Sequence, residues 1–251
     1  MPFRRFKADT RTRATSLLAQ SAQHLYEGGE YLRRNPGWHV EESAWKARQI
    51  LLMLNRNRVT PKTICDVGCG AGEVLRQLQQ HLNADSILWG YDISPQALEL
   101  SATRANETLR FRLADIREER DAFFDLILVL DVFEHLENYF SFLRDLKPRS
   151  DHKIFHIPLD LSVQTVLRRY GLLKRRDLYG HLHYFTKDLA LRTLEDVGYR
   201  ILDHFYTPRS LDLGAGPTDK VLKLPRRLSF AIAKDLTVRV LGGFSLLVLA
   251  K

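Results

Sequence analysis

The segment Thr63-Ile64-Cys65-Asp66-Val67-Gly68-Cys69-Gly70-Ala71-Gly72-Glu73-Val74-Leu75 says more about the fold than any other part of this 251-residue chain. A short apolar run ends in an acid, three glycines then alternate with single residues, and a helical pattern follows. This order predicts a strand, a tight glycine-rich turn and a helix N-terminus. Such a turn lets a ligand come close to bare backbone, with the first N–H groups of the helix aimed at it.

The spacing of the glycines is more specific than their number. A dinucleotide-binding turn needs G-x-G-x-x-G, and in that register the third glycine would fall on Glu73. Gly68, Gly70 and Gly72 instead follow G-x-G-x-G directly after Asp66, which disfavours a nucleotide-dependent oxidoreductase. The motif resembles the first motif of class I S-adenosylmethionine (SAM) methyltransferases. The resemblance implies SAM as cofactor and S-adenosylhomocysteine as product.

Strands and helices alternate along the rest of the chain. Apolar runs predict strands at 63–67, 86–91, 110–113, 124–130, 153–157, 199–206 and 244–251, with helices at 72–81, from 95 onward and at 187–197. The alternation predicts an α/β fold with a doubly wound, Rossmann-like, seven-stranded sheet. We expect a mostly parallel sheet with one antiparallel edge strand, because no convincing helix lies tightly between the last two strands.

Two domains are expected. Residues 1–60 read as an N-terminal helical lid, with helices at 10–34 and 41–54 separated by Asn35-Pro36-Gly37. Residues 61–251 read as the SAM-binding domain, with insertions near 159–184 and 211–240, the second containing a helix at 226–241. Insertions in an open α/β sheet often build the substrate side, because ligands bind beyond the carboxyl ends of the strands.

Composition sets further limits. The net charge of +8 can attract anionic lipid, nucleic acid or a phosphorylated substrate, or simply mark a solvated surface. Cys65 and Cys69, the two cysteines, do not form a disulfide framework. A reducing cytoplasm is therefore the simplest compartment, with peripheral membrane contact as an alternative. No apolar run approaches the roughly 20 residues of a membrane span.

Acids that follow the glycines support a cofactor site. Asp92 ends the second strand about 20 residues after Gly72, where a carboxylate can accept hydrogen bonds from the ribose hydroxyls. Its alternative role is to cap the following helix, but Ser94 can already provide that cap. In the resembling family the acid at Asp115 accepts from the adenine amino group and the next backbone N–H reaches the ring. The resemblance also implies that Asp66 lies near the methionine part of SAM, and its alternative role is to interact with the dipole at the helix N-terminus. The predicted cofactor-binding residues are Asp66, Gly68, Cys69, Gly70, Gly72, Asp92, Ile93, Asp115, Ile116 and Asp131.

The segment 130–136, Leu-Asp-Val-Phe-Glu-His-Leu, ends the fourth strand. It is similar to the corresponding segment of small-molecule enzymes such as the ubiquinone and menaquinone O-methyltransferases. The Asn/Asp-Pro-Pro-aromatic loop typical of amino methylation is absent there, and no cysteine has the Pro-Cys context of pyrimidine C5 methylation. We therefore set those two classes aside.

Histidines are the candidate bases, since a hydroxyl acceptor must lose a proton. His135 is the first choice. The resemblance also implies that His181 or His183, in the segment before the helix at 187, lines the cleft. A His-x-His pair can bind metal, but no third ligand has convincing spacing, so no metal is predicted. Each of these histidines has packing as its alternative role.

The acceptor side is predicted less sharply. Basic residues of the first insertion could bind a phosphate or carboxylate group of the acceptor. The helix that begins at Arg226 has a basic end and an apolar body, which is a pattern that can rest on a membrane surface. We expect O-methylation of a small-molecule, lipid-linked or glycan acceptor, and the basic residues favour one that carries an anionic group. The alternatives are an RNA or protein methyltransferase, for which no accessory RNA-binding module is seen, and a SAM-binding protein without catalysis. The predicted acceptor-side residues are Trp38, His39, His156, Arg168, Arg169 and Arg175.

Overall fold

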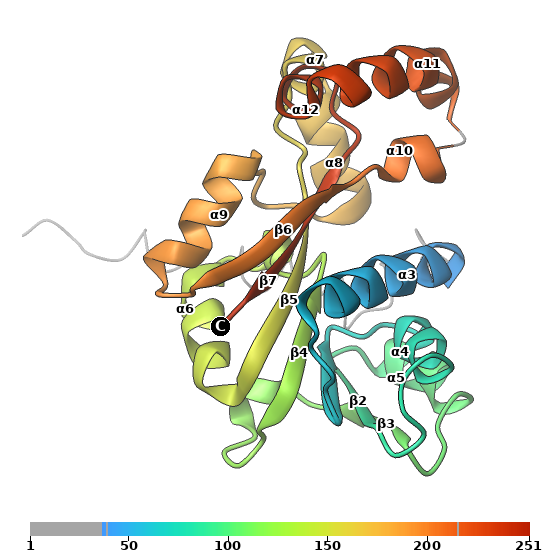
Figure 1. The fold of residues 1–251 in the computed structure, drawn as a ribbon, viewed down its shortest axis with the longest axis vertical. Helices are drawn as coiled ribbons and strands as arrows, with labels where there is room; N and C mark the ends of the chain where they lie inside the picture. Colours follow the sequence, from blue (N-terminus) through green and yellow to red (C-terminus); the bar gives the residue numbers. More distant parts are fainter. Residues whose placement is uncertain (1–36, 39, 215) are drawn as a thin grey trace, which may run out of the picture.

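A computed structural model describes residues 37–38, 40–214 and 216–251, so the predicted helix at 10–34 and His39 lie outside the described residues. Seven strands form one sheet in the order β3-β2-β1-β4-β5-β7-β6 (Figure 1). Their bounds are β1 Thr63–Val67, β2 Ile87–Asp92, β3 Leu109–Leu113, β4 Phe124–Leu130, β5 Ser150–Pro158, β6 Ile201–Thr207 and β7 Ser245–Ala250. The predicted fold class is confirmed.

Strands β1 to β5 pair in parallel, and β7 pairs antiparallel with both of its neighbours. The antiparallel strand is thus the last of the chain, and it lies one position in from the edge, between β5 and the edge strand β6. All six residues of β7 are buried.

Helices cover both faces of the sheet, as a doubly wound fold requires. Helices α3 (Val40–Asn57), α4 (Glu73–Gln79) and α5 (Pro95–Ala102) lie on one face, whereas α6 (Tyr139–Leu146) and α9 (Lys187–Asp196) lie on the other (Figure 1). Helix α6 was not predicted.

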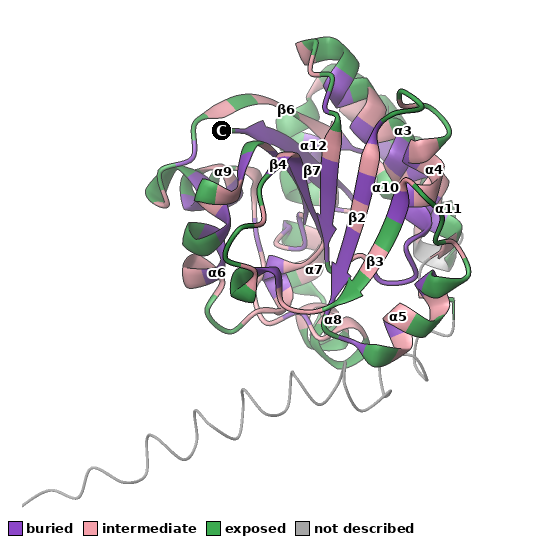
Figure 2. Ribbon diagram, turned by 90° about the horizontal axis from the view of Figure 1, so that it is seen from below, coloured by how far each residue is buried: buried purple, intermediate pink, exposed green. Residues whose placement is uncertain are grey.

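Alternate residues of the central strands enter two different cores. In β4, Leu126 and Leu128 join the core under α3 and α4, whereas Ile127 and Val129 join the core under α6 and α9. Side chains of a strand point alternately to its two faces, which is why a strand covered on both sides is apolar throughout. Figure 2 shows the central strands buried, with β3 exposed at the sheet edge.

The two insertions form a helical layer beyond the carboxyl end of β5 (Figure 1). The first contains α7 (Val163–Leu167) and α8 (Gly171–Tyr179); the second contains α10 (Arg209–Asp212), α11 (Pro217–Ile232) and α12 (Lys234–Leu241). The single helix expected at 226–241 was wrong, because the chain leaves helical geometry at Ala233, with φ −141°. Within the described residues, no helix has the length and apolar character needed to cross a bilayer.

Glu73, the residue that breaks the dinucleotide spacing, ties α4 to the end of α5. Its carboxylate accepts from Arg76 Nη2 at 2.6 Å, Gln77 Nε2 at 2.8 Å and Arg104 Nε at 2.7 Å. Hydrogen bonds from Arg76 are the main cause that lowers the pKa of Glu73 from 4.5 to about 2, against the opposing effect of burial.

We predict that Glu73→Gln lowers the free energy of unfolding at pH 7 by about 1–3 kcal/mol, since it removes charge-assisted hydrogen bonds. The folded-state pKa lies below the unfolded one, so this contribution is present above about pH 4.5 and is lost as the pH falls toward 2. Urea unfolding across this range measures it. The exposed Glu99→Gln serves as control and should change little; an equal loss in both variants would contradict the assignment.

Candidate functional site

The glycine-rich loop has a conformation that only glycine adopts readily. Gly68, Gly70 and Gly72 have φ values of 73°, 54° and 74°, in the left-handed region. The end of β2 anchors the loop: the N–H groups of Gly68 and Cys69 donate to the Tyr91 carbonyl at 2.8 and 3.1 Å. The loop is therefore held in shape by the protein itself.

A cavity of about 850 Å³ opens at the carboxyl ends of β1, β2 and β4. The glycine loop forms one wall, and residues of α8 and α11 and of the segments around them form the opposite wall. The structure brings most predicted site residues to this cavity, namely Trp38, Asp66, Gly68, Cys69, Gly70, Asp92, Ile93, Asp131, His135, His156, Arg168, Arg169, Arg175 and His181. Gly72, Asp115, Ile116 and His183 are not among the lining residues.

Trp38 packs directly on the glycine loop. A Cβ atom added to Gly70 would lie 2.4 Å from the indole Cδ1 of Trp38. The close approach of the two residues gives Gly70 a second reason, besides its backbone conformation, to lack a side chain.

Asp66 places a carboxyl group beneath the loop. It is 2% exposed, and its Oδ1 has no hydrogen-bond partner among the described residues. Burial raises the pKa of Asp66 from 3.8 to about 8; Lys46 opposes this shift and Asp92 adds to it. A buried oxygen without a partner implies a missing donor, and the ammonium of an amino-acid-like ligand fits that requirement.

Asp92 is oriented by backbone groups on both sides. Its Oδ2 accepts from Gly70 N at 2.8 Å and its Oδ1 from Ser94 N at 2.9 Å. Each carboxylate oxygen keeps a further lone pair for a hydroxyl donor. Ser94 is the N-cap of α5, accepting from Ala97 N, so the capping role is filled without Asp92.

Asp115 is engaged elsewhere. It caps a 3₁₀ turn, Ile116–Glu118, and accepts from Arg117 Nε at 2.9 Å and Nη2 at 2.5 Å. The Ile116 side chain is buried in the core on the α6 side of the sheet. The adenine-binding role of Asp115 and Ile116 stays a prediction. Because neither residue lines the cavity, adenine would have to extend beyond the cavity wall to contact them.

A partly buried charge network lies at the end of β4. Asp131 Oδ2 pairs with Lys46 Nζ at 2.7 Å, and its Oδ1 accepts from His156 Nδ1 at 2.7 Å. His156 Nε2 lies 3.0 Å from Thr207 Oγ1. Burial alone would raise the pKa of Asp131, but the nearby His156 and Lys46 hold it well below its usual value. The network joins α3, β4, β5 and β6.

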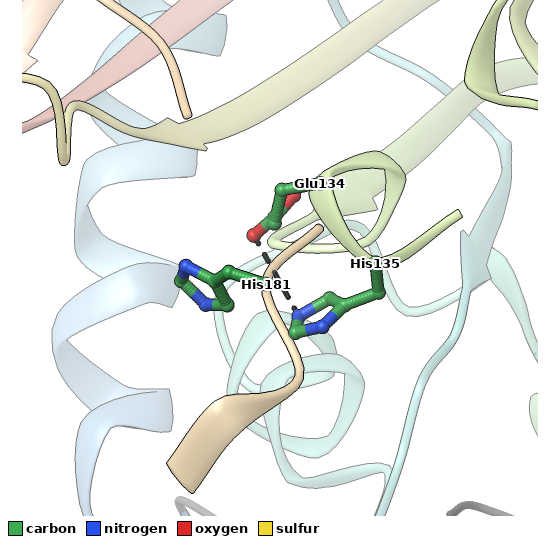
Figure 3. Close-up of side chains that lie close together, drawn as sticks. All are labelled: Glu134, His135 and His181. Carbon is green, nitrogen blue, oxygen red and sulfur yellow. Dashed lines mark ion pairs between the residues drawn. The ribbon is translucent and has the colours of Figure 1, made fainter. Parts of the chain in front are cut away.

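Glu134, His135 and His181 converge from two segments of the chain (Figure 3). Glu134 is fully buried, and neither carboxylate oxygen has a hydrogen-bond partner among the described residues. Burial, followed by repulsion from Asp131, raises the pKa of Glu134 well above its usual value. Burial and the neighbouring His181 lower the pKa of His135 to about 3, so His135 is neutral at pH 7.

The two histidines of the His-x-His pair have different surroundings. His181 lines the cavity and donates from Nδ1 to Asp160 Oδ2 at 2.7 Å, and Asp160 in turn pairs with Arg175 Nε at 2.8 Å. His183 lies outside the cavity, where its Nε2 donates to the Leu136 carbonyl at 2.9 Å. Sequence reasoning missed Lys46 and Asp160 as partners of site residues, because nothing near them in sequence marks the long-range contact.

A family model described as a methyltransferase domain matches residues 38–204. The chain belongs to this methyltransferase family. SAM is the methyl donor, in agreement with the glycine motif. A search of curated proteins returned no match.

Solved structures share the fold at low sequence identity. The magnesium protoporphyrin IX methyltransferase of Synechocystis PCC 6803, with bound S-adenosylhomocysteine, has a TM-score of 0.59 and 18% identity, covering 93% of this chain and 98% of that one. A methyltransferase in complex with the Trm112 activator of Haloferax volcanii has a TM-score of 0.62 and 14% identity, covering 89% and 94%. The N-methyltransferase NodS of Bradyrhizobium japonicum WM9 has a TM-score of 0.55 and 16% identity, covering 93% and 97%.

We predict a distinctive pH dependence for Asp66→Asn. The folded-state pKa of Asp66 is raised to about 8, so its contribution to stability is full below about pH 4 and is lost as the pH rises through 8. Between pH 5 and 8 the wild type should therefore lose stability relative to Asp66→Asn, by on the order of a few kcal/mol. Denaturant unfolding at several pH values measures the difference. The exposed Asp85→Asn should show no such trend, and a pH-independent difference for Asp66→Asn would contradict the assigned pKa.

Proposed function

We propose that this enzyme transfers the methyl group of SAM to an oxygen atom of an anionic, amphipathic acceptor, of the kind that a lipid-linked or glycan intermediate provides. The observation that carries this proposal is the composition of the cavity. Its lining runs from the glycine loop to a mouth where Arg168, Arg169 and Lys174 are exposed, and the exposed apolar residues Tyr170 and Leu178 also belong to the lining.

The cationic side chains that the two insertions contribute to the cavity lining fall into two groups. Arg175, Arg209 and Arg226 pair with Asp160, Glu42 and Asp219, respectively. Three further lining residues are exposed and have no acidic partner within the described part of the chain: Arg168, Arg169 and Lys174. These three supply uncompensated positive charge, which favours a phosphate or carboxylate group on the acceptor.

Apolar side chains stand beside these cations. Leu167 is 80% exposed, and Val166, Tyr170 and Leu173 are also exposed. Helices α7, α8, α11 and α12 contact one another in series at one end of the molecule (Figure 1), and α11 adds exposed residues up to Ile232, at 88%. A surface that combines basic and apolar residues is suited to the interface of an anionic membrane, where a lipid-linked acceptor would be found.

The proposed reaction is a direct in-line transfer. The acceptor oxygen forms a bond to the methyl carbon while the carbon–sulfur bond breaks. The electron pair of the broken bond returns to sulfur, which gives neutral S-adenosylhomocysteine. The hydroxyl proton leaves through the histidine cluster to solvent. Placing the two reactants in line accounts for much of the rate, and a base adds about 10²–10⁴-fold. His181, oriented by Asp160, is the best supported of the candidate histidines.

Calorimetry with SAM tests the donor site. We expect Asp92→Ala to weaken SAM binding by about tenfold or more, equivalent to about 1.4 kcal/mol, because it removes the acceptor of the ribose hydroxyls. NAD should not bind. Asp121→Ala, a substitution of an exposed residue outside the cavity lining, is the control. Unchanged SAM affinity in a folded Asp92→Ala variant would rule out the proposed ribose contact.

Vesicle sedimentation tests the acceptor side. Wild-type protein should bind vesicles that contain phosphatidylglycerol, and bind them less at high salt. The double substitution Arg168→Glu/Arg169→Glu should reduce binding by about tenfold or more, since each basic residue near the surface contributes about 1 kcal/mol. Arg120→Glu/Arg144→Glu changes the net charge equally at exposed positions outside the cavity lining. Equal loss in both double variants would show a general charge effect and no dedicated surface. If the wild-type protein binds RNA and not vesicles, and the double substitution Arg168→Glu/Arg169→Glu abolishes that RNA binding, the RNA alternative is favoured.

A further inference from the structure

We propose that Glu134, His135 and His181 bind one divalent transition-metal ion of the Zn²⁺ and Co²⁺ type at the floor of the cavity. One carboxylate and two imidazoles form a mixed oxygen and nitrogen donor set that such ions favour. All three residues line the cavity that holds the glycine loop.

The donor atoms are already close together. The three ligand atoms lie within 4.8 Å of one another, and Glu134 Oε1 lies 3.8 Å from His135 Nε2. Figure 3 shows the Glu134 carboxylate directed toward the two imidazole rings. Metal–ligand bonds of about 2.1 Å place tetrahedral donors roughly 3.4 Å apart. Binding therefore needs donor shifts of about an ångström, which side-chain rotations can supply.

The state of Glu134 is an independent sign of a ligand. Its side chain is 0% exposed, and both oxygens lack a hydrogen-bond partner among the described residues. Burying polar atoms without partners costs free energy, and nearly all such atoms in proteins are paired. A cation between the carboxylate and the imidazoles would satisfy this requirement.

His181 has the outer partner typical of a metal-binding histidine. Its Nδ1 donates to Asp160 Oδ2 at 2.7 Å, so Nε2 carries the lone pair available to an ion. Asp160 is fixed by Arg175. A carboxylate behind a ligating imidazole sets the tautomer and the ring orientation, and its loss weakens metal binding by about 10–100-fold.

Three protein ligands leave at least one coordination position free for an acceptor oxygen. A bound ion lowers the pKa of a hydroxyl group that it coordinates. With the ion bound, His135 and His181 act as ligands and not as bases, so the hydroxyl proton would pass directly to water, and the resulting oxygen would attack the methyl carbon. This role rests on the proposed O-methylation, whereas the metal site itself does not.

Metal binding can be measured without the acceptor. Full-length protein is treated with a chelator, checked for folding by circular dichroism, and titrated with Zn²⁺ by calorimetry and with Co²⁺ by visible absorption. We expect one ion per chain, with a d–d spectrum that shows nitrogen ligation. Glu134→Gln, which preserves side-chain volume, and His181→Gln should each weaken binding by at least about tenfold, and Asp160→Asn by about 10–100-fold.

His183→Gln is the matched control, because it changes the other histidine of the same segment and should leave metal affinity unchanged. The proposal is overturned if wild-type protein binds neither ion at millimolar concentration, or if Glu134→Gln and His181→Gln bind both ions as tightly as wild type. SAM calorimetry on the same samples separates the two hypotheses. Intact SAM binding without metal binding defeats the metal site alone, whereas metal binding without methyl transfer to any hydroxyl acceptor defeats the proposed function alone.

Discussion

Asp131 places a partly buried carboxylate at the carboxyl end of β4, where 26% of its side chain is exposed and an unpaired charge would be poorly solvated. Lys46 from α3 and His156 from β5 compensate it, so these elements must be correctly placed for the charge to be tolerated. The backbone of Asp131 is left-handed, with φ 56°. That turn directs the chain from β4 into the segment that carries Glu134 and His135, so the pairing of one partly buried acid helps to fix the position of the acceptor-side cluster.

The two sides of the cavity are built by different parts of the sheet. The ends of β1 and β2 present the glycine loop, Asp66 and Asp92, whereas the ends of β4 and β5 present Asp131, His135 and His156, and the segment between α8 and α9 adds His181. The strand order reverses direction between β1 and β4, and this is where open α/β sheets bind their ligands. The donor side is made of backbone geometry and short hydrogen bonds, and the acceptor side of side chains from distant segments. This division explains why the family relation defines the donor and leaves the acceptor to be found by experiment.

The sequence predicted the donor side of the cavity better than the acceptor side. The strands were located within a few residues because buried strands are continuous apolar runs, and the glycine loop is contiguous in the chain. Glu134 and His181 are far apart in sequence and joined only by folding, so no spacing rule could reveal them as a cluster. His181 and His183 seemed equivalent because alternate residues of an extended strand face one side. Their segment is irregular, and the two rings diverge. The break at Ala233 between α11 and α12 had no glycine or proline to mark it.

The position of β7 has a consequence for the order in which the molecule is assembled on the ribosome. Strand β6 pairs only with β7 among the strands described, and β7 is synthesised after α10, α11 and α12. During translation β1 to β5 can pair with one another as they emerge, which assembles the glycine loop and its acids early. Strand β6 must wait for β7 before it can join the sheet, and the helices between these two strands are held at the cavity mouth only when both are in place. A nascent chain would therefore acquire its SAM side first, and the pocket for the acceptor would close around it last.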